Sequence, residues 1–339
     1  MSRVLVMMSG GVDSSVAAAL LLEQGHDVTG VTLKLWGGDS DSGCCSVADV
    51  EDARRVAAQL GIAHYVFNFS DAFDANVVEP YVAGYASAQT PNPCVECNRS
   101  MKFGAALERA DALGFDFVAT GHHARVVDTP NGRAVARGAD SAKDQSYVLY
   151  MLGERELSRV LLPVGELTKA QVRERARTLR LRTADKRESM DVCFITHHGR
   201  QAFLGARIPR RPGVIVDTTG NYVGSHDGVD AFTIGQRRGL DVAVGERRYV
   251  TDISAERATV TVGPAVALLR EEVQLRDATF VWSPPRDVLV QTRAHGDPVA
   301  AELDGDVVRF AVPQPRVAPG QVVACYDGDV LLGGGVVAA

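Results

Sequence analysis

The heptapeptide Ser9-Gly-Gly-Val-Asp-Ser-Ser15 decides the fold, because it stands between an apolar run at residues 4–8 and a helix-forming run at residues 16–24. Adjacent glycines let a backbone approach an anion closely, and the amides at the start of a helix point toward that anion. The serine hydroxyls add donors, and Asp13 is suited to fix the loop or to help hold Mg²⁺. We therefore predict a strand, a phosphate-binding loop and a helix in succession. The alternative is a plain strand-to-helix turn with a serine cap.

This loop differs from the two common nucleotide-binding loops. It lacks the lysine of G-x-x-x-x-G-K-[ST] and the spacing of G-x-G-x-x-G, which argues against a kinase, a GTPase and a dinucleotide dehydrogenase. It resembles the S-G-G-x-D-S signature of the ATP pyrophosphatase (PP-loop) superfamily. The resemblance implies cleavage of ATP between its α- and β-phosphates, with transfer of AMP to a substrate oxygen.

Strand-like and helix-like runs alternate through the first half of the chain. After the loop and its helix, we expect strands at residues 26–36, 62–69 and 115–120, and helices at residues 47–60 and 101–113. Ser46 is placed to cap the first of these helices and Gly61 to end it. Such alternation predicts an α/β domain with a parallel sheet, and places Gly121 near the loop at the point where the strand order reverses. His122 and His123 follow, and histidines at such a place are more often packed than catalytic.

The second half of the chain has a different pattern. Thr168 and Gln171 match a capping box that opens a basic helix to about residue 182. From about residue 207 the chain is β-rich, and two Asp-Gly pairs between apolar runs, at 304–305 and 327–328, predict hairpins. We expect three domains: a nucleotide-binding domain at 1–204, a small central domain at 205–270 and a C-terminal antiparallel β-barrel at 271–339.

Length and composition limit the remaining possibilities. At 339 residues, 46% of them hydrophobic, the chain is long enough for two or three packed domains. No apolar stretch reaches the length of a bilayer span, and the amino terminus lacks a signal-peptide pattern. Six cysteines are too few for a disulfide-stapled secreted domain. We therefore expect a soluble, cytoplasmic protein with no membrane partner.

The charge of the chain is unevenly distributed. The whole chain carries a net charge of −6, yet the window of residues 169–211 holds twelve basic and four acidic residues, a net charge of +8. A basic patch on an acidic protein can guide a polyanion to one face, so nucleic acid is a candidate partner. The alternative is that an arginine-rich composition simply fills solvated helices with arginine.

The cysteines are expected to be metal ligands or reactive thiols. Cys94 and Cys97 form a C-x-x-C in a proline-rich stretch that we expect to be a loop, and Cys193 follows the basic helix. Three interpretations are open for these cysteines: a zinc site, an iron–sulfur cluster on all three, or thiol chemistry. In the last, one thiolate carries a sulfane sulfur and another releases it as a disulfide forms.

Thiol chemistry requires exposed cysteines near cations that lower the thiol pKa. The cations close to them in sequence are Arg99, Lys102, Lys186 and Arg187. Cys325, in a predicted barrel strand, is expected to be an inert core residue. The adjacent Cys44 and Cys45 do not complete a second C-x-x-C, so a zinc pattern is incomplete.

Taken together, six motifs make the chain similar to the bacterial tRNA-specific 2-thiouridylases. They are SGGVDSS at 9–15, TPNPCVECN at 90–98, ATGHHAR at 119–125, KDQSY at 143–147, DVCFI at 191–195 and TIGQRRGL at 233–240. The resemblance extends over nearly the full length. It implies ATP-dependent 2-thiolation of the wobble uridine of tRNA, by adenylation of the C2 oxygen and sulfur transfer from a cysteine persulfide. A sulfur-carrier protein would supply that persulfide.

The resemblance also implies roles for individual residues. Cys97 corresponds to the nucleophile and Cys193 to the persulfide carrier. Contacts with ATP are expected from residues of the loop and two neighbouring strands: Met7, Met8, Ser9, Gly10, Gly11, Val12, Asp13, Ser14, Leu33 and Gly121. Contacts with the target base or with nearby tRNA are expected from Asn92, Pro93, Cys94, Lys143, Asp144, Gln145, Arg293 and Ala294. No metal ligand is expected besides a possible cluster on the three cysteines, and Mg²⁺ is expected to accompany ATP.

The sequence departs from the family pattern in two places. Many members carry Asp where this chain has Cys94, so a third thiol stands beside the nucleophile. An Arg-Tyr pair that touches tRNA in relatives aligns with Arg293-Ala294, which weakens that contact here. The competing predictions are another PP-loop enzyme, such as a lysidine synthetase or an amidating ligase, and a non-catalytic metal- or cluster-binding RNA module. Neither the synthetase nor the ligase needs paired cysteines.

Overall fold

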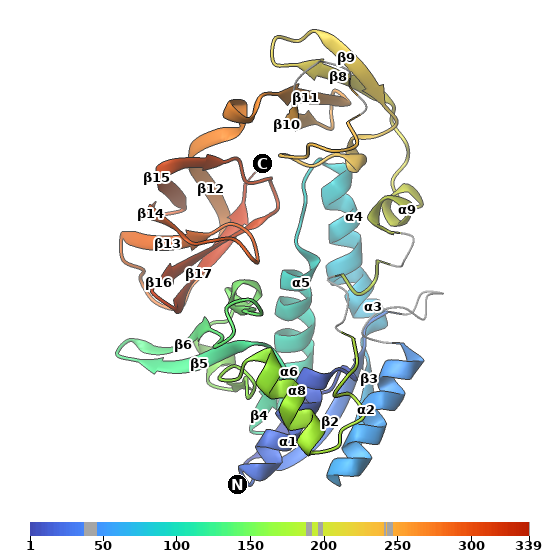
Figure 1. The fold of residues 1–339 in the computed structure, drawn as a ribbon, viewed down its shortest axis with the longest axis vertical. Coiled ribbons are helices and arrows are strands. Elements are labelled where there is room, and N and C mark those ends of the chain that lie inside the picture. The colour runs from blue at the N-terminus through green and yellow to red at the C-terminus, as the bar shows by residue number, and fades with distance from the viewer. Residues whose placement is uncertain (37–45, 188–191, 196–198, 241, 243–246, 339) are drawn as a thin grey trace.

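A five-stranded parallel sheet forms one end of the molecule (Figure 1). The computed structural model describes residues 1–36, 46–187, 192–195, 199–240, 242 and 247–338. The strands occur in the order β3-β2-β1-β4-β7, with the bounds β1 Arg3–Met7, β2 Asp27–Lys34, β3 His64–Asn68, β4 Phe117–Ala119 and β7 Val160–Leu161. The predicted α/β class is confirmed. Because β1 lies between β2 and β4, the segments after β1 and β4 meet where the strand order reverses.

The alternation of side chains along β1 builds a core on each face of the sheet. Val4, Val6 and Met8 pack on one face with helices α1 Val12–Glu23, α2 Val47–Leu60 and α8 Lys169–Thr178. Leu5 and Met7 pack on the other face, in a core that extends to Phe73, Leu107 and the barrel residue Tyr326. The second core therefore joins the sheet to the rest of the molecule.

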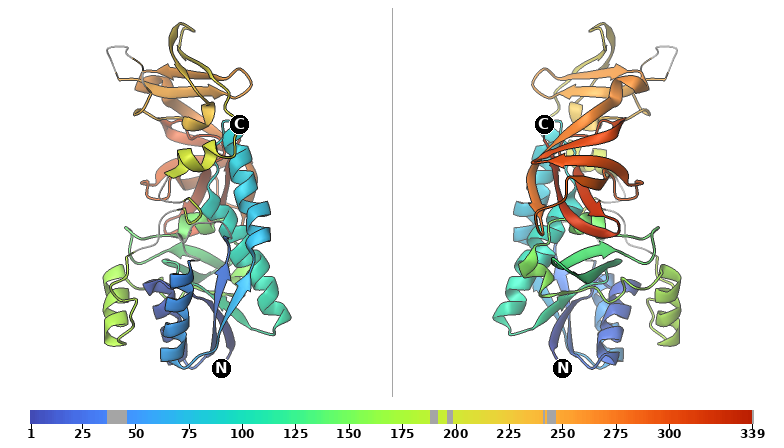
Figure 2. Two further views of the ribbon diagram at one scale, coloured as in Figure 1. Left: turned by 90° about the vertical axis from the view of Figure 1, so that its right-hand side faces the viewer. Right: turned by 90° about the vertical axis from the view of Figure 1, so that its left-hand side faces the viewer.

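Two long helical segments cover the second face and run toward the opposite end of the molecule (Figures 1 and 2). Each contains a π-helical stretch. The first consists of α3 Ser70–Phe73, a π-helix at Asp74–Val78 and α4 Glu79–Ala86; the second of α5 Pro93–Glu96, a π-helix at Cys97–Ala105 and α6 Ala106–Ala112.

The prediction of a loop around Cys94 and Cys97 was wrong. The helix predicted for residues 101–113 begins at Pro93, so both cysteines are helical. Asn92 supplies the cap, since its Oδ1 accepts a hydrogen bond from the backbone N of Cys94 at 3.1 Å. Proline fits the first position of a helix because that amide has no intrahelical partner.

Other helix boundaries follow the local signals. The Oγ of Ser46 accepts a hydrogen bond from the backbone N of Asp49 at 3.1 Å, and Gly61 ends α2 with a φ of 72°, as predicted. The capping box of Thr168 and Gln171 is confirmed, although α8 ends at Thr178, before residue 182. Helix α1 begins at Val12, four residues earlier than predicted, so the second half of the heptapeptide is helical.

The C-terminal strands form a closed six-stranded antiparallel barrel (Figure 2). Its order is β12-β15-β14-β13-β16-β17, closed by pairing of β12 with β17. The bounds are β12 Leu269–Phe280, β13 Asp287–Gln291, β14 Val299–Asp304, β15 Val307–Pro315, β16 Val322–Asp327 and β17 Val330–Val337. Both predicted hairpins are confirmed, with Gly305 and Gly328 at positive φ in their turns.

A hairpin from the first half of the chain extends the barrel sheet, which the sequence did not indicate. Strands β5 Ala124–Thr129 and β6 Gly132–Arg137 pair with each other, and β6 pairs with β17 through Ala136 and Val330. This pairing was missed because it joins segments almost two hundred residues apart. It fixes the barrel against the nucleotide-binding domain.

A separate four-stranded sheet, β10-β11-β8-β9, lies at the far end of the molecule (Figure 1). Its bounds are β8 Gly213–Asp217, β9 Tyr222–His226, β10 Tyr249–Ser254 and β11 Thr259–Gly263. The remaining elements are α7 Glu154–Leu157, α9 Gly199–Gly205 and 3₁₀ turns at Ser146–Leu149, Val229–Ala231 and Ala265–Leu268. Within the described ranges, every helix is too short or too polar to cross a bilayer.

Candidate nucleotide and thiol site

The loop after β1 is shaped by glycines and serines. Gly10 has a φ of 71°, and a Cβ there would lie 2.2 Å from the carbonyl oxygen of Asp49, so only glycine fits. Gly11 is the N-cap of α1, and a Cβ there would come no closer than 3.4 Å to the Oγ of Ser9. The Oγ of Ser14 accepts from the backbone N of Ser9 at 3.2 Å and donates to the carbonyl of Gly11 at 3.2 Å. The loop thus places serine hydroxyls beside the first amides of a helix, an arrangement that suits a phosphate.

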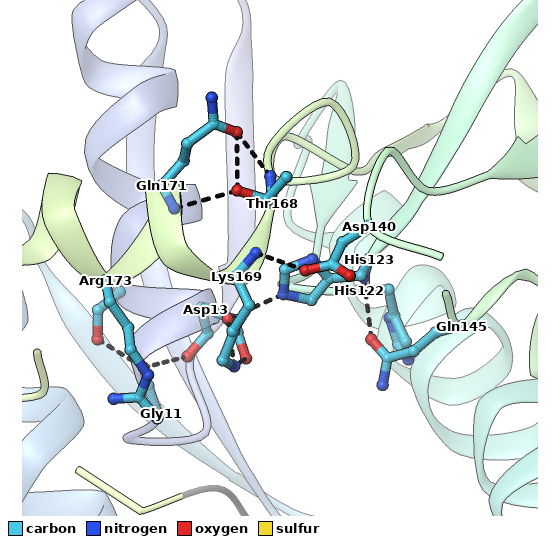
Figure 3. A network of polar contacts seen from close by, with 12 residues as sticks. Gly11, Asp13, His122, His123, Asp140, Gln145, Thr168, Lys169, Gln171 and Arg173 are labelled. Atoms are coloured by element: carbon cyan, nitrogen blue, oxygen red, sulfur yellow. Dashed lines mark hydrogen bonds and ion pairs between the residues drawn. The ribbon is translucent and has the colours of Figure 1, made fainter. Parts of the chain in front are cut away.

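The carboxylate of Asp13 is held by a lysine and a histidine (Figure 3). The Nζ of Lys169 donates to its two oxygens at 2.6 and 2.8 Å, and the Nε2 of His123 lies 3.0 Å from Oδ1. Burial raises the pKa of Asp13, but the hydrogen bonds from His123 and Lys169 outweigh burial and keep the pKa below 3.8. Of the two roles considered for Asp13, these contacts support fixing the loop.

Sequence reasoning missed Lys169, which it counted only as part of the basic window. Its backbone N donates to Asp140 Oδ2 at 2.9 Å, and its side chain reaches from the first turn of α8 to the first turn of α1. The capping box at Thr168 was the available signal, because it places Lys169 at the first position of the helix.

Gly121 lies at the switch point, as predicted. A Cβ at this residue would lie 2.6 Å from the backbone N of Ser14, so β4 approaches the start of α1 closely only because this residue is glycine. The next residue, His122, is buried and packed, as expected. Its Nδ1 lies 2.7 Å from Thr120 Oγ1, and its Nε2 lies 3.5 Å from Lys102 Nζ. Burial, and then the charge of Lys102, lower the pKa of His122 well below 6.5.

The other predicted ATP contacts near the loop are buried. Met7, Met8, Val12 and Leu33 are between 1% and 8% exposed. The backbone N of Met8 donates to the carbonyl of Val31 at 2.7 Å, which continues the sheet up to the loop. Their contact with a nucleotide stays a prediction.

Lys186 links the loop to helix α2. Its Nζ donates to the carbonyl of Gly10 at 3.0 Å, to Asp49 Oδ1 at 2.7 Å and to Asp52 Oδ2 at 2.7 Å. Burial lowers the pKa of Lys186, but its hydrogen bonds to Asp49 and Asp52 outweigh this and raise the pKa. Lys186 therefore acts on the loop, whereas the sequence suggested a role near the thiols.

The structure brings Cys97 and Cys193 into one region. Cys97 is 8% exposed and belongs to the large core beside the sheet, and the half-buried Cys193 packs against the same core. Cys97 is buried because it lies on the inward face of its helix with Met101, one turn further on, so thiol chemistry at this residue requires the core around it to open.

Phe194 anchors the segment that carries Cys193. Its ring is 1% exposed and packs in tilted or edge-to-face geometry against four aromatic rings, at centroid distances of 5.2 to 6.1 Å. Those rings belong to Trp36, Phe73, Tyr81 and Phe203. Cys94 is half-buried and electrostatically close to Tyr81, so Cys94 and Cys193 both border this aromatic cluster.

The cations expected near the thiols have other contacts. Arg99 donates to Tyr150 at 3.0 Å and pairs with Glu96 at 3.6 Å, and Lys102 lies against His122. In the barrel, burial raises the pKa of the Cys325 thiol to about 12, which confirms it as an inert core residue. Cys44 and Cys45 lie outside the described residues.

The segment before Cys94 is bonded to the barrel. The side-chain amide of Gln321 donates to the carbonyl of Thr90, and the backbone N of Thr90 donates to the carbonyl of Pro319 at 2.8 Å. Asn92 and Pro93 then form the helix start described above. The predicted base-binding residues therefore lie where the nucleotide-binding domain meets the barrel.

The predicted tRNA-binding residues Lys143, Asp144 and Gln145 differ in exposure. Gln145 is exposed, Lys143 half-buried and Asp144 buried. Gln145 is also tied to the nucleotide site, because its Oε1 accepts from the backbone N of His123 at 2.9 Å. In the barrel, the carbonyls of Arg293 and Ala294 both accept hydrogen bonds from Gln291.

No group of three or more histidine, cysteine or acidic side chains in the described ranges is arranged to hold a metal ion. The cysteines described above are thus not arranged as cluster ligands, and the carboxylate nearest the loop, Asp13, already binds Lys169.

Three family models match consecutive parts of the chain. Residues 2–197 match "tRNA methyl transferase HUP domain", residues 201–264 "tRNA methyl transferase PRC-barrel domain" and residues 270–337 "Aminomethyltransferase beta-barrel domain". A solved 4-thiouridine synthetase in complex with RNA and ATP aligns with 61% of this chain, and the alignment covers 46% of the synthetase chain. The sequence identity is 18% and the TM-score is 0.40, so this likeness does not bear on function.

Curated relatives match over the full length. The chain is 49% identical over 369 residues to a tRNA-specific 2-thiouridylase MnmA of Roseiflexus castenholzii, with 100% of both chains covered. It is 46% identical over 354 residues to that of Carboxydothermus hydrogenoformans, covering 99% of this chain and 97% of the relative. Identity at this level over whole chains shows that the protein belongs to the tRNA-specific 2-thiouridylase family.

Proposed function

We propose that this protein is an ATP-dependent tRNA-uridine 2-sulfurtransferase of the cytoplasm, which replaces the C2 oxygen of the wobble uridine with sulfur. The observation that carries the proposal is that one domain holds both the S-G-G-x-D-S loop and two thiols, Cys97 and Cys193, that share one core. A PP-loop enzyme that transfers nitrogen would have no use for such a pair. We propose the domain division 1–204, 205–270 and 271–339 for this enzyme.

The first step activates the base. ATP binds with its phosphates at the loop of residues 9–14, and uridine leaves the anticodon stack to bind at residues 92–94. The C2 oxygen attacks the α-phosphate, which forms an adenylated uridine and releases pyrophosphate. The amides at the start of α1 stabilise the charge on the departing pyrophosphate. Mg²⁺ arriving with ATP would add positive charge at the phosphates.

The second step delivers sulfur. The thiolate of Cys193 attacks the terminal sulfur of a persulfide on a sulfur-carrier protein, whose own thiolate leaves, and Cys193 becomes a persulfide. The thiolate of Cys97 then attacks the inner sulfur of that persulfide, the one bonded to Cys193. A Cys97–Cys193 disulfide forms, the sulfur–sulfur bond of the persulfide breaks, and hydrosulfide departs with the electron pair. Hydrosulfide attacks C2 and AMP leaves. An external dithiol then reduces the disulfide for the next cycle.

An iron–sulfur cluster on Cys94, Cys97 and Cys193 is the alternative use of the same thiols, and it requires the three cysteines to come together, since they form no metal-binding group in the described residues. The two proposals differ in the iron and sulfide that the purified protein should contain. A cluster requires iron and acid-labile sulfide in stoichiometric amounts in protein purified without oxygen. The disulfide scheme requires neither.

The proposed function is tested by weighing the nucleosides of tRNA after incubation with the purified protein, ATP and a sulfide source. We expect a uridine that is heavier by the difference between sulfur and oxygen, formed only when ATP is present. Equal product without a nucleotide would overturn the proposal, because the role of the loop would then be lost.

A further inference from the structure

One arginine connects residues 143–145 and residues 293–294, the two segments away from Asn92 to Cys94 for which the family resemblance implies contact with tRNA. The Nη1 of Arg137 donates to Asp144 Oδ2 at 3.2 Å and to Gln291 Oε1 at 2.7 Å. Asp144 belongs to the first segment, and Gln291 lies two residues before the second. The contact spans the boundary between the nucleotide-binding domain and the barrel.

Gln291 uses both ends of its amide. It is 2% exposed, and while its Oε1 accepts from Arg137, its Nε2 donates to the carbonyls of Arg293 at 2.8 Å and of Ala294 at 2.9 Å. The turn that follows β13 is therefore held to the guanidinium through a single buried side chain. Arg293 itself remains exposed.

The carboxylate of Asp144, the other acceptor of Arg137, also has several hydrogen bonds within the protein. Its carboxylate accepts from the backbone N of Gly138 at 2.9 Å and from Ser146 at 3.1 and 2.7 Å, in addition to Arg137. It is 6% exposed, so direct contact with RNA would break this network. Its neighbours Lys143 and Gln145 are the more accessible residues of the segment.

The guanidinium that links the two segments is fixed in place. It lies 3.9 Å from the centroid of the Tyr326 ring, and the backbone N of Arg137 donates to the carbonyl of Asp329 at 2.9 Å. The hydroxyl of Tyr326 is in turn 3.0 Å from Ser146 Oγ. A planar, delocalised cation can stack on a ring while one nitrogen binds two acceptors, which a lysine does not reproduce.

We propose that Arg137 and Gln291 are positioning residues that hold segments 143–145 and 293–294 as one RNA-docking surface across two domains. The proposal rests on the proposed function, since tRNA is the ligand. Lys143 and Arg293 supply the positive charge for phosphates, and the buried Arg137–Gln291 bond sets the spacing of the two segments. Preorganised spacing lowers the conformational cost of binding, so affinity for tRNA depends on the whole chain of hydrogen bonds from Arg137 through the Gln291 amide to the turn.

The test measures binding of fluorescent tRNA to the full chain without ATP, so that it does not depend on catalysis. Gln291→Leu removes all three hydrogen bonds of the amide, and Gln291→Glu keeps an acceptor for Arg137 while losing the donor to the turn. Tyr147→Phe is the matched control. It removes another buried bond between the domains, from the Tyr147 hydroxyl to the carbonyl of Val322 at 2.8 Å, which touches neither segment.

We expect both Gln291 variants to bind tRNA about tenfold more weakly, equivalent to about 1.4 kcal/mol. Tyr147→Phe should bind tRNA as tightly as the wild type does, even if its Tm falls by as much as the Tm of the Gln291 variants. The inference is overturned if the Gln291 variants bind like the wild type, if Tyr147→Phe weakens binding equally, or if the wild type does not bind tRNA. A wild type that binds tRNA without thiolating it refutes the proposed function and leaves this inference standing.

Discussion

Asp13 and Lys169 form a short ion pair although 156 residues separate them, and that pair joins the first turn of α1 to the first turn of α8. The carboxylate belongs to the first turn of α1, whose amides we propose as the phosphate site. Lys169 therefore neutralises a negative charge that would otherwise repel ATP.

Replacing Lys169 should weaken ATP binding. In Lys169→Met the carboxylate of Asp13 loses its cation, and we expect KM for ATP to rise about tenfold, measured by pyrophosphate release in the presence of tRNA. Adding Asp13→Asn removes the unpaired charge, so the double variant should bind ATP better than the product of the two single effects. Additive effects would contradict the coupling.

A second pair between the same helices provides the control. Arg175 on α8 binds Glu23 on α1 at the surface, away from the loop. Arg175→Met should leave KM for ATP unchanged and lower the free energy of unfolding by at most about 1 kcal/mol.

The glycines of the loop should respond differently to alanine. Gly10→Ala introduces a clash with Asp49 as well as an unfavourable φ, and should lower the free energy of unfolding by more than about 2 kcal/mol. Gly25→Ala is the control, because Gly25 has a φ of 81° but nothing near its added Cβ, and should cost about 1 kcal/mol. Urea unfolding measures both.

Gly11→Ala should change phosphate binding while leaving the stability of the fold almost unchanged. The backbone of Gly11, with a φ of −92°, accepts alanine, so stability should change by no more than about 0.5 kcal/mol. The added methyl group would stand beside the first amides of α1, and KM for ATP should rise at least about tenfold. An unchanged KM would show that the phosphates do not bind at these amides.

Local signals made the nucleotide-binding domain predictable. The sheet, the limits of α2 and the capping box of α8 are set by residues close in sequence, such as Ser46 and Gly61, so the pattern alone indicates them. The helix start at Pro93 was missed because a proline-rich stretch resembles a loop, although Asn92 and Pro93 are a favourable cap and first position.

The contacts that complete the site could not be predicted from local patterns. Lys169 reaches Asp13 only because α8 packs against α1, and Lys186 reaches Gly10 across the end of α2. No sequence pattern near either lysine indicates its partner. The same holds for Arg137 and Gln291, which meet only once β6 has paired with the barrel.

The two proposed reactive thiols should be required for sulfur transfer and not for cleavage of ATP. Cys97→Ser and Cys193→Ser should each lower formation of 2-thiouridine more than about a hundredfold, because each step of the proposed sulfur transfer between them needs a thiolate. Pyrophosphate release with tRNA should continue. Cys325→Ala, in the barrel core, should retain thiolation and lose about 1 kcal/mol of stability. Thiolation by either serine variant with a persulfide, not free sulfide, as the sulfur source would refute the two-thiol scheme.

The buried His122 should make the stability of the protein depend on pH. Its Nε2 faces the ammonium of Lys102, which can only donate, so Nδ1 carries the proton and the ring is neutral in the folded protein. The folded pKa is well below the ordinary 6.5. Below pH 6.5 an unfolded chain therefore binds a proton that the folded protein excludes. The contribution of His122 to stability is present above pH 6.5 and is lost as the pH falls.

We expect His122 to contribute a loss of about 1 kcal/mol per pH unit to the free energy of unfolding as the pH falls from 6.5 toward 5.5. His122→Gln keeps a side chain that can hydrogen-bond to Thr120 but does not titrate, so its stability should fall less over this range. Urea unfolding of both proteins at pH 7.5, 6.5 and 5.5 measures the difference. Between pH 7.5 and 6.5 the two proteins should diverge by only about 0.4 kcal/mol, because the unfolded chain is no more than half protonated at this histidine down to pH 6.5. Equal losses below pH 6.5 would mean that the folded protein accommodates the charged ring, which requires Lys102 to move away from it.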